Sequence, residues 1–105
     1  MGWFIVPYAY GLAGDQSGLP DAEARHRCNV ALNVARSLPN ALIVLGAGMP
    51  EVTAKRGIAN LAAASQKYLA IMGWPSNKVL ANPRGWDTVT ETEAVLEAIN
   101  ESASS

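Results

Sequence analysis

Short apolar runs alternate with longer segments of helical periodicity along the 105 residues of the chain. The first run, Trp3 to Tyr10, is aromatic and β-branched, and the second, Ala41 to Leu45, is apolar without interruption. A third, shorter run spans Lys78 to Asn82. A strand without polar alternation is typical of a parallel sheet covered on both faces. The pattern predicts an α/β fold: a small parallel sheet of about three strands with helices packed on it, a Rossmann-like βαβαβα half-unit with Ala41 to Leu45 in its centre.

Apolar residues at spacings of three and four after each run predict three helices. We expect the first from about Asp21 to Leu38, the second from about Ile58 to Met72, and the last from Asp87 or Thr88 onward. Gly73 stands where a left-handed C-terminal cap would end the second helix. The residues of the last helix that we expect to face the core are Val89, Thr92, Val95, Leu96 and Ile99.

The chain is expected to form one domain over residues 1–101, with the polar tail 102–105 fraying. Three strands leave two free sheet edges. We therefore expect either a homo-oligomer or a continuation of the sheet outside this chain.

Right-handed crossovers would place the ends of all three strands and the starts of all three helices on one rim of the sheet. The loops of this rim are Gly11 to Pro20, Gly46 to Gly57, and Asn82 to Asp87. Helix N-termini carry unpaired N–H groups that favour anions. The rim is therefore the place where we expect a ligand.

A glycine turn, Gly46-Ala47-Gly48, follows the second run. Glycines without a Cβ let the backbone approach a ligand closely, but they equally serve a purely structural turn. The segment is not a complete dinucleotide fingerprint, because Glu51 occupies the third glycine position, and it lacks the lysine of a P-loop. Both interpretations stay open.

The segment Thr88 to Glu91 matches the capping box of a helix start, in which Thr88 and Glu91 satisfy the first N–H groups. Because this segment lies on the expected rim, Asp87, Thr88 and Glu91 are also candidates for contacts to a hydroxyl or an amine of a ligand.

Arg25, His26 and Arg27 lie near the start of the first helix, with side chains about 100° apart. We choose Arg27 as the ligand's cationic partner because it borders the apolar stripe; a solvated arginine is the alternative. We interpret His26 as a surface residue. Cys28 falls on the apolar stripe and is expected to be a small core residue. Asp15, in the first loop, is a candidate base or metal ligand, with an Asx-turn as the simpler interpretation.

The net charge of −1 and the scattered basic residues argue against nucleic acid or a membrane as partner. A single cysteine excludes an internal disulfide, and residues with metal-ligand spacing are not found. No leader or bilayer-spanning stretch is recognisable, so we expect a cytoplasmic protein.

The order of these motifs resembles the YdcF/SanA/ElyC-like family of bacterial Rossmann-like domains. The matching segments are Arg27…Ala31, Ile43 to Gly48, Tyr68-Leu69…Gly73-Trp74-Pro75, Lys78 to Leu80, and Asp87 to Glu91. The chain departs from the family at Leu61, where the family has a glutamate, and the family continues into further strands. The resemblance implies a nucleotide-binding type of domain, with S-adenosylmethionine or another nucleotide as a candidate cofactor.

The expected function is the binding of a small anionic or nucleotide-like ligand at the rim, through Gly11, Arg27, Gly46, Gly48, Asp87 and Thr88. If the protein is an enzyme, we expect a hydrolase or transferase with Asp15 or Glu91 as the base. The alternative is a non-catalytic interaction or oligomerisation module that uses an exposed sheet edge and its aromatic residues.

Overall fold

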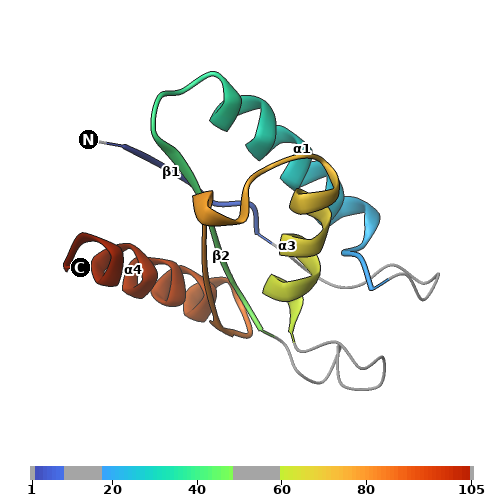
Figure 1. Cartoon of the computed structure of the whole chain (residues 1–105). Helices are drawn as coiled ribbons and strands as arrows, with labels where there is room; N and C mark the ends of the chain where they lie inside the picture. Colours follow the sequence, from blue (N-terminus) through green and yellow to red (C-terminus); the bar gives the residue numbers. More distant parts are fainter. Residues whose placement is uncertain (1, 9–17, 49–59, 105) are drawn as a thin grey trace.

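The computed structural model describes residues 2–8, 18–48 and 60–104 and confirms the predicted α/β fold (Figure 1). Its elements are β1 (Trp3–Ile5), α1 (Ala22–Arg36), β2 (Ala41–Ala47), α3 (Leu61–Ile71), the 3₁₀ helix η2 (Ser76–Lys78), β3 (Val79–Gly85) and α4 (Thr88–Ser104). Within the described ranges, none of the helices combines the length and apolar character needed to cross a lipid bilayer.

In the described ranges the sheet has three parallel strands in the order β1-β2-β3, so β2 is the central strand, as predicted. Phe4 pairs with Leu42 on one side of β2, and Val44 pairs with Leu80 on the other. Figure 1 shows α1 and α3 side by side on one face of the sheet and α4 on the other. Both faces of the central strand are therefore covered.

The core follows the alternation of side chains along β2. Ile43 and Leu45 point toward α1 and α3 and pack with Leu32 and Leu69. Val44, which points to the opposite face, packs with Val95 and Ala98 of α4. This two-sided burial explains why the sequence of β2 carries no polar alternation.

Side chains and a glycine determine the helix ends. The carboxylate of Asp21 caps α1 by accepting from the N–H of Ala24 at 2.9 Å, and the amide oxygen of Asn60 caps α3 in the same way. Gly73 ends α3 in the left-handed conformation at φ 89°, and the N–H of Trp74 donates to the carbonyl of Leu69. This confirms the predicted left-handed cap.

Two strands run further than the sequence pattern predicted. Gly46 and Ala47 belong to β2, so the prediction of a glycine turn at these residues is wrong. Pro83 to Gly85 belong to β3, although the sequence pattern placed them in a loop. Pro83 is tolerated because β3 is an edge strand. The pairing is irregular here: Leu45 pairs with Ala81 and Ala47 with Gly85, so β3 advances by four residues where β2 advances by two.

The buried face of α4 also differs from the prediction. Val95 is buried as predicted, but Val89 and Leu96 are exposed, and Ala94, Ala98 and Glu91 are buried in addition. α4 approaches the backbone of β2 closely at Gly46, where Glu91 and Val95 are its nearest neighbours. The helix continues to Ser104, past its expected end near residue 101.

Candidate functional site

The helices α1, α3 and α4 begin on the side of the sheet where the strands end, which follows from the parallel topology and is visible in Figure 1. This rim is where ligands bind in open α/β sheets. Gly11 and Asp15 lie outside the described residues, so their predicted roles are not addressed by the structure.

The two glycines at the end of β2 are in close contact with the chain itself. A Cβ on Gly46 would lie 2.7 Å from the carbonyl oxygen of Glu91, and a Cβ on Gly48 would collide with the carbonyl of Pro83. The N–H of Gly48 donates to the carbonyl of Gly85 at 2.7 Å. These contacts support the structural interpretation of the glycines, since the space beside each is filled by protein and the amide of Gly48 is already engaged.

The start of α4 is capped one residue earlier than predicted. The carboxylate of Asp87 accepts from the N–H of Thr90 at 2.8 Å, and the hydroxyl oxygen of Thr90 accepts from the N–H of Asp87 at 3.1 Å. The capping box is thus Asp87 with Thr90, not Thr88 with Glu91. The hydrogen bonds from Thr90 hold the pKa of the Asp87 carboxyl below its ordinary value.

The remaining candidates on α4 differ in how far they are exposed. Thr88 is exposed at the first helical position, and its carbonyl accepts from the hydroxyl of Thr92 at 2.8 Å. Glu91 is only 5% exposed and packs against the glycine positions of β2 and β3. Thr88 is therefore accessible to a ligand, whereas Glu91 lies within the domain.

Arg27 lies on the outer side of α1, beside the end of β1. Its Nε is 3.4 Å from a carboxylate oxygen of Glu23, and it lines a groove of about 380 Å³ together with Tyr8 and Val30. His26, which is exposed as predicted, lines the same groove. The described lining of this groove comes from β1, the residues after it and α1, and the glycines at the end of β2 are not among it.

Arg25, which the sequence interpretation passed over, lies on the face of α1 that meets α3. It stands one turn before Asn29, whose side chain accepts from the hydroxyl of Tyr68 on α3 at 2.8 Å. The contact of Ala24 with Leu61 places this turn of α1 beside the start of α3. The Nε of Arg25 is buried, and none of residues 2–8, 18–48 and 60–104 provides it with a hydrogen-bond acceptor.

The spacing of α1 does not distinguish Arg25 from Arg27, because Arg25 precedes Cys28 by three residues and Arg27 precedes Ala31 by four. The side of α1 that meets α3 is known from the bond of Tyr68 to Asn29, which lies four residues after Arg25. A choice by distance from the apolar stripe alone did not separate the two arginines.

Cys28 is a core residue, as predicted. It is 1% exposed, and burial raises the pKa of its thiol to about 11, with the hydrogen bond from Ser65 acting in the opposite direction. Such a thiol is a poor nucleophile because the reactive species is the thiolate. The described side chains form no group of three or more histidine, cysteine, aspartate or glutamate residues able to hold a metal ion.

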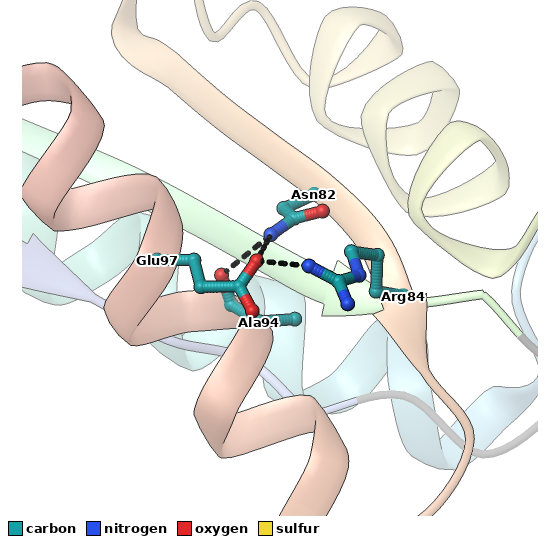
Figure 2. Close-up of polar contacts among 4 residues, drawn as sticks. All are labelled: Asn82, Arg84, Ala94 and Glu97. Carbon is teal, nitrogen blue, oxygen red and sulfur yellow. Dashed lines mark hydrogen bonds and ion pairs between the residues drawn. The ribbon is translucent and has the colours of Figure 1, made fainter.

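A polar cluster joins the outer edge of β3 to α4, as Figure 2 shows. The carboxylate of Glu97 accepts from Arg84 at 2.6 Å and from the amide of Asn82 at 3.2 Å, and Asn82 also donates to the carbonyl of Ala94 at 3.0 Å. The pairing of Arg84 with Glu97 is exposed. We interpret this cluster as an attachment of α4 to the sheet rather than as a ligand site.

No protein-family model matches the sequence, and searches of curated proteins and of solved structures likewise found no match. The resemblance to YdcF-like domains therefore stays a prediction from the motifs of the chain.

Proposed function

We propose that this protein binds a small anionic or nucleotide-like molecule at the carboxyl end of the sheet, with Arg25 as the cationic partner. The observation that carries the proposal is the buried Nε of Arg25, which lacks an acceptor among the described residues. A buried donor without an acceptor costs about 1–3 kcal/mol. An anionic oxygen of a ligand beside Arg25 would supply the missing acceptor.

The chemistry of the guanidinium fits this role. Its planar set of donors matches a phosphate or carboxylate in a bidentate arrangement, and it is always charged. Arg25 lies near the starts of both α1 and α3, where the helix dipoles favour an anion. The proposal therefore replaces Arg27 by Arg25: the two side chains leave α1 about 200° apart and do not reach the same small ligand.

The other predicted residues take secondary roles in this proposal. Thr88 is available for a hydroxyl contact, while Gly11 and Asp15 stay predictions because they lie outside the described residues. If the protein is an enzyme, we expect hydrolysis or group transfer with Asp15 rather than the buried Glu91 as the base. S-adenosylmethionine or another nucleotide is the cofactor that the motif resemblance implies. A cytoplasmic location agrees with the one cysteine, which is free.

A thermal-shift panel of nucleotides, sugar phosphates and S-adenosylmethionine tests the proposal. A compound that binds the folded state raises the Tm by an amount that grows with its excess over Kd. We expect Arg25→Met to abolish this shift and Arg25→Lys to weaken it. Arg27→Met is the matched control, because it removes the same charge from the opposite side of α1, and it should keep the shift. A shift that survives in Arg25→Met, or the absence of any shift in the wild type, would contradict the proposal.

A further inference from the structure

In the sheet formed by residues 2–8, 18–48 and 60–104, the two edge strands β1 and β3 differ in how they are protected from pairing with a further strand. The edge strand β3 carries Pro83, which cannot donate to a neighbouring strand, the register irregularity opposite β2, and the charged side chain of Arg84. These features discourage pairing with another strand. The edge strand β1 has none of them: its side chains are Trp3, Phe4 and Ile5, with Trp3 52% and Phe4 42% exposed.

The exposed apolar surface extends from β1 onto both faces of the sheet. Successive side chains of a strand point to opposite faces, so Trp3 and Phe4 extend it on different sides. On the face covered by α1, Val30 and Val34 are 49% and 41% exposed, and both line the groove of about 380 Å³ beside the carboxyl half of β1, whose polar lining includes His26 and Arg27. A second hollow of about 470 Å³, lined by Trp3, Phe4 and Leu42, lies beside the amino half.

We propose that this edge is a homodimer interface, in which β1 pairs antiparallel with β1 of a second copy of the chain. A partner has to supply an unpaired strand flanked by apolar side chains on both of its faces. An identical edge supplies both. A two-fold axis perpendicular to the sheet makes the strands antiparallel, places the carboxyl half of one β1 beside the amino half of the other, and joins the two three-stranded sheets into one.

The area available agrees with a dimer of modest affinity. The exposed parts of the four apolar side chains amount to about 350 Å² per copy on ordinary side-chain areas, whereas a standard interface buries about 800 Å² per partner. The strand backbone and the walls of the two hollows contribute the remainder. We therefore expect a monomer–dimer equilibrium that shifts toward the monomer on dilution.

Sedimentation equilibrium of the full chain over a range of protein concentrations tests this interface. The wild type should show a concentration-dependent dimer. Val30→Lys places a charge in the proposed interface and should leave a folded monomer. Val89→Lys is the matched control: Val89 is a helical valine on α4 that is 66% exposed, and its replacement should leave dimerisation unchanged. Far-UV circular dichroism and the Tm verify that both variants fold.

Hydrogen exchange provides a measurement that does not depend on a variant. The amides of β1 should exchange more slowly as the concentration of wild-type protein increases, while those of the edge strand β3 should not change. A monomer at every concentration, equal dimerisation of the two lysine variants, or equal protection of both edges would overturn the proposal. Because Arg25 faces α3, Arg25→Met should dimerise as the wild type does, so the outcome is independent of the ligand site.

Discussion

The hydroxyl of Tyr8, just past β1, lies 2.8 Å from Oγ1 of Thr92 in α4. Because the Thr92 hydroxyl donates its one hydrogen to the carbonyl of Thr88, Tyr8 is the donor and Thr92 the acceptor. The bond connects residues 84 positions apart in the sequence and fixes the end of β1 against α4. Neither residue was predicted for this role.

Removing this bond should destabilise the domain by about 1 kcal/mol, the usual net value of a hydrogen bond. We expect Tyr8→Phe and Thr92→Val each to lower the free energy of unfolding in urea, and the double variant to lose less than the two effects combined. Tyr68→Phe, which removes the bond to Asn29, is a matched control that should add independently to Thr92→Val. Full additivity of Tyr8→Phe with Thr92→Val would contradict the geometry.

A methyl group at Gly46 should be far less tolerated than one at Gly73. Gly46→Ala brings a Cβ to 2.7 Å from the carbonyl oxygen of Glu91. Because this oxygen belongs to the backbone, α4 can relieve the clash only by moving away from the sheet, and we expect the free energy of unfolding to fall by about 3 kcal/mol. Gly73→Ala meets no atom within 4 Å but forces an alanine into the left-handed region, at about 1–2 kcal/mol. Urea unfolding compares the two, and the reverse order would show that α4 does not approach β2 as described.

The cap at Asp87 should make the stability of the domain dependent on acid pH. The hydrogen bonds from Thr90 lower the folded-state pKa of this carboxyl. The ionised carboxylate therefore stabilises the fold fully above its unfolded-state pKa of about 3.9. This stabilisation is lost as the pH falls through the folded-state pKa. We expect the Tm of the wild type to approach that of Asp87→Asn as the pH is lowered below about 4. Other carboxyls are common to both proteins and cancel in this difference. A constant difference in Tm across the pH range would exclude the charge of Asp87 as the cause.

Cys28 should react with thiol reagents only after unfolding. Its thiol is buried and has a pKa of about 11, so at pH 8 almost none of it is thiolate in the folded protein. The rate of labelling by a disulfide reagent should follow the unfolded fraction as urea is added. Rapid labelling of the native protein at pH 8 would show that the contact between α1 and α3 opens readily.

Replacing Arg25 by methionine should stabilise the ligand-free protein. The change removes a buried donor that has no acceptor among the described residues and keeps most of the apolar stem, so the free energy of unfolding should increase by about 1 kcal/mol. Arg27→Met, on the solvent side of α1, should change it by less than about 0.5 kcal/mol. Destabilisation by Arg25→Met would mean that the guanidinium is already satisfied within the chain.

The sequence allowed the fold to be predicted because the relevant signals are local. The unbroken apolar run from Ala41 identified a strand covered on both faces. Gly73 identified the end of α3, because glycine adopts the left-handed conformation of such a cap more easily than residues with a side chain. The buried face of α4 could not be predicted in this way. Hydrophobicity favours Val89 and Leu96, but Glu91 and Val95 are the residues of α4 that meet Gly46, and Ala94 and Ala98 are buried with them. The face of α4 that is buried is a property of the packed pair of helix and sheet.

The candidate site was predicted less completely, for similar reasons. Asp87 and Thr88 are both good capping residues, and only the three-dimensional structure shows that Asp87 with Thr90 forms the cap. Likewise, Arg25 and Arg27 are the same residue type and lie only two positions apart in the first half of α1. Their difference depends on which side of α1 is occupied by α3, which is a tertiary relationship.

The arginine side chains themselves provide the most direct test of the anion site. In ¹H–¹⁵N spectra that resolve the Nε–H groups of the arginines, we predict that the signal of Arg25 moves saturably during titration with a nucleoside diphosphate, while that of Arg27 stays in place. An Arg25 signal that stays fixed while Arg27 or every arginine shifts would contradict the account.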